Sequence, residues 1–323
     1  MALSIEITEF GGPEQLQLVD RDPPPPAAGE VRVRHSAIGV NFVDIYHRSG
    51  LYPLTLPFTP GVEGAGVVEA VGEAVDGLAP GDRVAYAGTP LGGYAQVRNL
   101  PAARAMKLPG DIADDVAAAG LLRGLTVQLL LSGPRPVAPG STILVHAAAG
   151  GLGQMLIRWA KRLGVTTIGT VGTEDKARIA REAGASAVIV GRDADFSARV
   201  LDLTGGKGVD IAYDGVGGDY LRRTFDAVAE FGMVASVGQA GGLPPPVPVT
   251  DLTKRSLMLW RPSVMLYIAN DARYRAAAAE VLSLLACGEA PVRMGAEYPL
   301  KDAARAHADL EAGRTTGSLL LRP

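Results

Sequence analysis

Residues 141–153, STILVHAAAGGLG, carry an apolar run directly into a string of small side chains. Residues 154–163 then repeat apolar side chains at helical spacing, so the order predicts a strand, a tight turn and a helix. Such a turn aims backbone N–H groups and a positive helix N-terminus at one point, which suits a pyrophosphate. Gly150 and Gly153 fit the close-approach positions of a dinucleotide fingerprint, with Ala148 in place of the first glycine. An ordinary glycine-rich turn is the alternative interpretation.

The composition is that of a soluble globular protein. The 323 residues are 47% hydrophobic and 20% charged, and the net charge of −3 disfavours nucleic acid and anionic membranes as partners. We see no export signal and no uninterrupted apolar segment near the roughly 18 residues of a membrane span. One cysteine, Cys287, fits a reducing compartment, so we expect the cytoplasm.

The pattern of elements changes along the chain. Residues 1 to about 120 read as short strands with Gly and Pro turns, which favours a barrel-like β domain. From residue 142 strands and helices alternate, which predicts a parallel, doubly wound α/β sheet. The expected helices are 111–131, 174–183, 196–203, 220–229, 272–285 and 302–312. The expected later strands are 165–171, 187–190, 209–214, 233–237, 256–260 and 318–321.

The end of the second strand of this sheet bears on the choice of nucleotide. An acid there would bind the adenosine ribose of NAD, but residues 170–173 contain none. Lys176, and Arg192 after the third strand, can neutralise a 2′-phosphate, which favours NADPH. Glu174 and Asp175 oppose this inference by repelling phosphate, and Lys176 as a solvated helix residue is the alternative.

The residue types also limit the chemistry. One cysteine and four histidines without short ligand spacing make a zinc site improbable, so we expect no metal. G-x-S-x-G is absent, which argues against a serine nucleophile. Residues 41–53, which we expect to form a loop of the β domain, gather polar and aromatic groups. Asn41, Tyr46 and Tyr52 can donate hydrogen bonds to a nicotinamide or a planar acceptor, although loop tyrosines more often only pack.

Motifs along nearly the whole chain strengthen this interpretation. They are FGGPEQLQ, AIGVNFVDIYHRSGLYP, GVEGAGVVEAVG, RGLTVQLLL, HAAAGGLGQ, GTVGTEDK, VDIAYDGVG, RPS, YPLKDAARAH and TTGSLLL. With these motifs the chain resembles the zinc-free quinone oxidoreductase branch of the medium-chain dehydrogenase/reductase superfamily, especially its bacterial NADPH:quinone oxidoreductases, with the zeta-crystallin group next. In zinc-dependent relatives a histidine of G-H-E-x-x-G holds metal, and Val62 occupies that position here.

The resemblance implies a domain organisation. A GroES-like catalytic domain would comprise residues 1–125 and 267–323, with a Rossmann NADPH-binding domain, 126–266, inserted between them. NADPH would lie in the interdomain cleft, and a homodimer would form through the sheet edge at residues 256–260.

The resemblance also assigns site residues. The catalytic set would be Asn41, Tyr46, Tyr52 and Arg261. Two departures weaken the NADPH preference: Gly191 replaces a tyrosine, and the relatives' C-terminal arginine falls on Gly313 beside Arg314. The cofactor contacts would be Asn41, Phe42, Asp44, Tyr46, Thr126, Ala149, Gly150, Gly151, Leu152, Gly172, Thr173, Lys176, Gly215, Val216, Val237, Gly238, Arg261 and Arg314.

The expected function is NADPH-dependent, zinc-independent reduction of quinones. Reduction of an activated C=C bond, as in enones, is the main alternative, because the same hydride donor serves both acceptors. A nucleotide-binding protein without catalysis, with an RNA-binding or structural role, is the alternative from another class. The sequence leaves open whether electrons pass as a hydride or one at a time.

Overall fold

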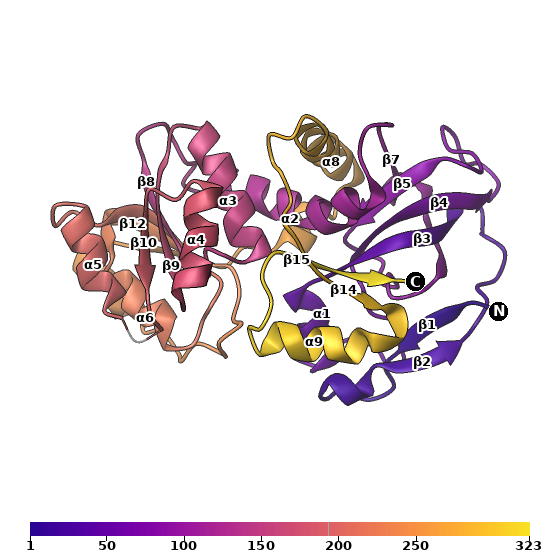
Figure 1. The fold of residues 1–323 in the computed structure, drawn as a ribbon, viewed down its shortest axis with the longest axis horizontal. Coiled ribbons are helices and arrows are strands. Elements are labelled where there is room, and N and C mark those ends of the chain that lie inside the picture. The colour runs from indigo at the N-terminus through magenta and orange to yellow at the C-terminus, as the bar shows by residue number, and fades with distance from the viewer. Residues whose placement is uncertain (193) are drawn as a thin grey trace. The chain divides into compact units, whose positions relative to one another are not determined.

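The computed structural model describes residues 1–192 and 194–323, which form two compact units (Figure 1). Unit 1 comprises Met1–Leu125 and Met265–Pro323, and unit 2 comprises Thr126–Val264. Unit 2 is therefore a single insertion in the chain of unit 1. Helix α2 (Asp114–Ser132) begins in one unit and ends in the other, and the short α7 (Val264–Tyr267) spans the second boundary.

Unit 1 is built on a curled, mostly antiparallel sheet. Its strands lie in the order β14-β15-β3-β4-β5-β7, with β6 also paired to β3, and β1 and β2 form a separate hairpin. β3 pairs with three strands and buries Val31 and Val33 on its inner face, as its alternation predicts. The strands are β1 (Leu3–Glu6), β2 (Gln17–Asp20), β3 (Glu30–Val40), β4 (Glu63–Val71), β5 (Arg83–Ala87), β6 (Val97–Pro101), β7 (Met106–Lys107), β14 (Met294–Pro299) and β15 (Ser318–Arg322).

The helices of unit 1 include one that the sequence did not predict. Residues 41–53 were expected to form a loop, but Phe42–Arg48 is helix α1, which begins after Asn41. Asp44 accepts a hydrogen bond from the Asn41 backbone N–H at 2.9 Å, so the Asn-x-x-Asp spacing starts the helix. The remaining helices are α8 (Asp271–Ala286) and α9 (Ala303–Glu311), and α9 packs against α1.

Unit 2 is a parallel sheet with helices on both faces. Its strand order is β10-β9-β8-β11-β12-β13, so the direction of winding reverses between β8 and β11. Figure 1 shows α3 and α4 on one face and α5 and α6 on the other. The elements are β8 (Thr142–Val145), α3 (Gly151–Arg162), β9 (Thr166–Val171), α4 (Glu174–Ala183), β10 (Ala187–Val190), α5 (Phe196–Leu203), β11 (Val209–Asp214), α6 (Asp219–Phe225), β12 (Val228–Ser236) and β13 (Met258–Trp260).

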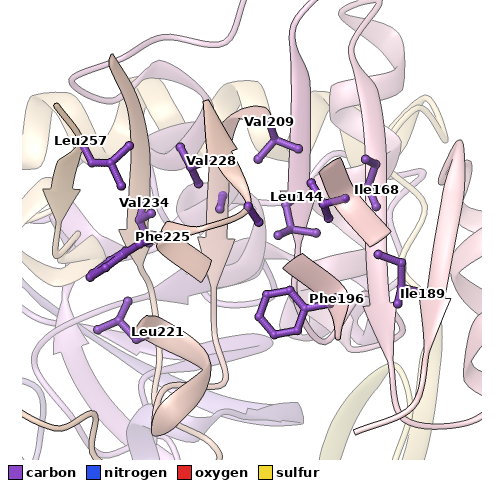
Figure 2. Close-up of a cluster of buried hydrophobic side chains, with 13 residues drawn as sticks. Leu144, Ile168, Ile189, Phe196, Val209, Leu221, Phe225, Val228, Val234 and Leu257 are labelled. Carbon is purple, nitrogen blue, oxygen red and sulfur yellow. The ribbon is translucent and has the colours of Figure 1, made fainter. Parts of the chain in front are cut away.

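One face of this sheet is covered by apolar side chains from α5 and α6. In Figure 2, Phe196, Leu221 and Phe225 lie beside the strand residues Leu144 and Val234. The predicted helix 220–229 ends earlier, at Phe225, because the chain from Val228 onward pairs with β11. Val228 and Ala229 therefore belong to strand β12 instead of the predicted helix.

Helix α2 is the most apolar long helix of the described residues. By length and composition alone it is apolar enough to cross a membrane, although Asp115, Arg123 and Gln128 interrupt it, so it is not an uninterrupted apolar segment. Most of its apolar window, 61%, is buried inside the fold, as in the core helix of a soluble protein. The apolarity of α2 is therefore explained by packing.

Candidate active site

The turn after β8 has the geometry that a pyrophosphate requires. Gly150 is the N-cap residue of α3, so the first N–H groups of that helix follow it directly. A Cβ on Gly153 would lie 2.7 Å from the Ala147 carbonyl oxygen, so only glycine permits this packing. Ala148 fits the first fingerprint position because the facing residue of β9 is Gly169, where a Cβ would lie 2.8 Å from that of Ala148.

A buried histidine, His146, stabilises this turn, a role that the sequence did not predict. His146 lies at 2.8 Å from the Thr170 hydroxyl through Nδ1 and at 2.9 Å from the Thr224 hydroxyl through Nε2. The Thr224 hydroxyl donates its own proton to the Tyr220 carbonyl at 2.7 Å, so it accepts from His146 Nε2. Burial lowers the pKa of His146 to about 3, which keeps the ring neutral. The ring thus ties together β8, β9 and α6.

The residues predicted to select the adenosine phosphate lie after β9 and β10. Thr173 caps α4 and accepts from the Lys176 backbone N–H at 3.4 Å. A Cβ on Gly172 would lie 3.5 Å from the Arg192 side chain, so Arg192 reaches the end of β9. Gly191 has φ +117°, a conformation that a tyrosine rarely adopts. The loss of the relatives' tyrosine is therefore accompanied by a turn that suits glycine.

Two further predicted segments lie at the same edge, after β11 and β12. Asp214 accepts from the N–H groups of Val216 at 2.8 Å and Gly217 at 3.1 Å, which fixes the turn that contains Gly215. Burial raises the pKa of Asp214 and these donors oppose the rise. Arg261 donates to the carbonyl and hydroxyl oxygens of Ser236, each at 3.0 Å. All these segments meet because parallel strands end at one edge, where the reversal of winding places ligands in such sheets.

In unit 1 the structure gathers the predicted aromatic residues on α1 and in the segment that follows it. The rings of Tyr46 and Tyr52 are 5.3 Å apart and meet edge to face, and those of Phe42 and Tyr46 are 6.2 Å apart. Tyr46 is 9% exposed and Tyr52 is 39% exposed. Tyr52 is therefore the more accessible hydrogen-bond donor of the pair, and Tyr46 is largely a packing residue in this state.

The acids near α1 form a buried network that the sequence did not reveal. The Asn41 side chain donates to Glu63 at 2.7 Å, and Glu63 pairs with Arg123 at 3.2 Å. Burial raises the pKa of Glu63, and these donors oppose that rise. Burial also raises the pKa of Asp44 to about 7. The side chain of Asp44 is fully buried, and its hydrogen bond with the Asn41 N–H helps to hold Asn41 in place.

Two more predicted residues lie on or after other helices. Thr126 is half-buried in α2. Arg314 follows α9 and donates to Asp309 through two nitrogens, at 2.8 and 2.6 Å. It lines a hollow of about 510 Å³ in unit 1, formed by Arg293, Met294, Gly295, Ala296, Tyr298, Asp309, Arg314, Thr315 and Thr316.

Potential metal ligands are scattered. Within residues 1–192 and 194–323, no three His, Cys, Asp or Glu side chains are grouped so that they could hold a metal ion. Val62, at the position of the histidine ligand in zinc-dependent relatives, is fully buried between Gly61 and Glu63. A valine offers no metal ligand there.

Known proteins resemble this chain over its whole length. Residues 27–110 match a family described as alcohol dehydrogenase GroES-like domain, and residues 151–284 match one described as zinc-binding dehydrogenase. A quinone oxidoreductase of Pseudomonas aeruginosa is 44% identical, with both chains covered completely. The chain belongs to the quinone oxidoreductase family.

Two further relatives refine this membership. The crystal structure of the Escherichia coli quinone oxidoreductase, complexed with NADPH, is 44% identical with a TM-score of 0.95, and covers 99% of this chain and 100% of that one. A 2-haloacrylate reductase of Burkholderia is 40% identical, over 100% of this chain and 99% of its own. The predicted family and fold class, a Rossmann sheet joined to a GroES-like unit, are therefore confirmed.

Proposed function

We propose that this protein is an NADPH:quinone oxidoreductase that works without zinc. The observation that carries the proposal is the end-to-end likeness to quinone oxidoreductases, one of them solved with NADPH. The unit 2 edge supports it, because the Gly150 turn and the neighbouring strand ends suit a dinucleotide. We assign residues 126–266 to the NADPH-binding domain and residues 1–125 with 267–323 to the catalytic domain.

In this proposal the residues of the chain bind and orient NADPH and the acceptor. When bound, NADPH would supply the electrons that reduce the acceptor. The turn after β8 would hold the pyrophosphate, Thr173 and Lys176 the adenosine phosphate, and Gly215, Gly238 and their neighbours the nicotinamide end. Asn41 has one amide hydrogen donated to Glu63 and keeps a second for the cofactor. Tyr52, the exposed tyrosine, would donate to the acceptor oxygen as negative charge develops there.

Cofactor choice is the first test. Titration of protein fluorescence should give tighter binding of NADPH than of NADH. Lys176→Ala and Arg192→Ala should each weaken NADPH binding about tenfold and leave NADH binding nearly unchanged, since each removes a charge-assisted contact to the phosphate. Tighter binding of NADH by the unaltered protein would contradict the assignment.

Acceptor choice is the second test. Steady-state rates with a benzoquinone and with a cyclic enone would separate the two reductase functions. The 2-haloacrylate reductase relative favours the enone as second candidate, because haloacrylates also carry an activated C=C bond. Fast enone turnover beside negligible quinone turnover would replace the first proposal. Tight NADPH binding without oxidation by any acceptor would favour a non-catalytic role.

We also propose a cytoplasmic homodimer with small-molecule acceptors and no nucleic acid or membrane partner. Strand β13 ends the parallel sheet, and its residues Met258 and Leu259 are 40% and 37% exposed. An apolar strand at a sheet edge favours pairing with a second copy. Leu259→Lys should therefore convert the dimer to a monomer in light-scattering measurements, whereas an unchanged mass would exclude this edge.

A further inference from the structure

A line of buried side chains crosses unit 1 from α9 to α1. Arg48, only 2% exposed, pairs with Glu311 at 2.7 Å and contacts His307 Nδ1 at 3.2 Å. His307 Nε2 lies 2.9 Å from the Tyr94 hydroxyl, and that hydroxyl donates to Asp44 Oδ2 at 3.1 Å. We call Arg48, His307, Tyr94 and Asp44 the α1–α9 chain.

The hydrogen bonds of the α1–α9 chain have a fixed direction. Arg48 can only donate, so His307 Nδ1 accepts and the ring proton sits on Nε2. Tyr94 has one proton, which it gives to Asp44, so its oxygen accepts from His307. Burial and the nearby Arg48 charge lower the pKa of His307 to about 3, which agrees with this neutral ring. Every donor along the chain therefore points toward Asp44.

Asp44 connects these hydrogen bonds to Asn41, the residue after which α1 begins. Its Oδ2 also accepts from the Asn41 backbone N–H at 2.9 Å, while Asn41 holds Glu63 through its side chain. Asp44 Oδ1 is buried and makes no hydrogen bond, so Oδ2 carries the hydrogen bonding of the carboxyl group. Loss of the Tyr94 donor would leave the Asn41 N–H as the donor to that oxygen.

We propose that Tyr94 and His307 are positioning residues for the reductase reaction: through Asp44 they hold Asn41 and helix α1 in the arrangement that binds the nicotinamide end of NADPH. The inference rests on the proposed function, which assigns Asn41 to the cofactor. Neither residue is assigned contact with cofactor or acceptor, so both act through Asp44.

The proposal implies a dependence on pH. The pKa of Asp44 is raised to about 7, because burial and the Glu63 carboxylate on β4 raise it more than Asn41, Tyr94 and Arg123 on α2 lower it. Arg48 on α1 and the neutral His307 on α9 complete the surroundings of the Tyr94 hydroxyl. Above this pKa the ionised carboxylate holds its two donors more strongly. NADPH should therefore bind more tightly at pH 8 than at pH 6.

Tyr94→Phe tests the proposal, with Tyr86→Phe as the matched control. Tyr86 is also buried in unit 1, and its hydroxyl lies 2.7 Å from a histidine, His35. The other ring nitrogen of His35 contacts the Ala95 carbonyl, so this pair is not linked to a carboxylate through His35. Fluorescence titration of the full chain should show NADPH affinity about tenfold lower in Tyr94→Phe, since a hydrogen bond to a charged group is lost. The pH midpoint of binding should rise in Tyr94→Phe, and Tyr86→Phe should change neither quantity.

A second pair keeps the proposal testable if Tyr94→Phe folds poorly. His307→Gln retains an N–H near the Nε2 position and should preserve most NADPH affinity, whereas His307→Leu should lose it. Equal affinities and pH midpoints for Tyr94→Phe and Tyr86→Phe, or equal affinities for the His307 variants, would overturn the proposal. Asn41→Ala distinguishes a failure of the proposed cofactor contact from a failure of the positioning role. Unchanged NADPH binding there refutes the assignment of Asn41 itself, whereas weakened binding in Asn41→Ala with normal binding in Tyr94→Phe refutes only the positioning role.

Discussion

The candidate site residues of unit 1 and those of unit 2 are positioned by different means. In unit 2 the turn after β8 uses backbone groups and small residues, and its decisive contact joins Gly153 to Ala147 within one short segment. In unit 1 the surroundings of α1 use buried charged side chains, and Arg48 meets Glu311 across 263 positions of sequence. Adding atoms should therefore disturb the turn of unit 2, whereas loss of a charged partner should disturb the surroundings of α1 in unit 1.

The largest expected effect comes from breaking a buried pair in unit 1. Glu63→Gln should lower the free energy of unfolding by about 3 kcal/mol, because Arg123 loses its counter-charge in a buried site. Urea unfolding measures the change. The exposed pair Arg178–Glu182 supplies the control, since Glu182→Gln should cost less than about 0.5 kcal/mol. A cost below about 1 kcal/mol for Glu63→Gln would mean that Glu63 is already protonated in the folded protein.

Adding one carbon tests the turn of unit 2. Gly153→Ala should weaken NADPH binding about thirtyfold, because a Cβ 2.7 Å from the Ala147 oxygen must push the turn away from its position. Isothermal titration gives the affinity. Gly110→Ala is the control, since nothing lies within 4 Å of its added Cβ. If both variants bind NADPH normally, close packing at Gly153 has no part in binding.

Acid should weaken unit 2 through His146. Its pKa is about 3 in the folded protein and 6.5 without burial, so the unfolded chain binds the extra proton between these values. This histidine therefore contributes stability that is present above pH 6.5 and is lost as pH falls toward 3, by about 1.4 kcal/mol per pH unit. Urea unfolding at pH 7 and pH 5 should show a smaller loss in His146→Asn than in the unaltered protein. Parallel losses in the two proteins would exclude this histidine as a cause.

The smallest effect is expected at Arg314. Its guanidinium is already paired with Asp309 and its side chain is 61% exposed, so a phosphate would compete with that carboxylate for a solvated charge. Arg314→Ala should reduce NADPH affinity less than about threefold, as is usual for exposed charges. The same titration used for Lys176→Ala provides the comparison. A tenfold loss would show that Arg314 leaves Asp309 when the cofactor binds.

The sequence predicts those parts of the fold that depend on neighbouring residues. The expected spans 174–183, 196–203 and 209–214 coincide with α4, α5 and β11, because each carries its own periodicity and its own turn signals. The 41–53 segment was wrong as a loop although its start signal is local: Asp44, three residues after Asn41, accepts from the Asn41 N–H, and the Asn-x-x-Asp spacing was not recognised as a helix start. Residues 226–229 were wrong as helix, because pairing with β11 depends on a partner strand.

The same distinction applies to the candidate site. The glycine turn is readable because its residues are consecutive, and parallel strands bring the other predicted segments of unit 2 to the same edge. The α1–α9 chain was not predicted, since Tyr94 and His307 are 213 positions apart and no local pattern connects them. No local signal marks these residues, because Arg48 lies between His47 and Ser49 and His307 lies close to Arg305 and Asp309 in the sequence.

The insertion of unit 2 also sets an order for synthesis. Thr126–Val264 is one continuous piece, so all its strands have left the ribosome before α9 is translated. Arg48 is translated early, whereas its partners His307 and Glu311 are translated near the end of the chain. Because domains generally fold as units during synthesis, the nascent protein completes unit 2 first. Unit 1 is completed only when α9 packs against α1.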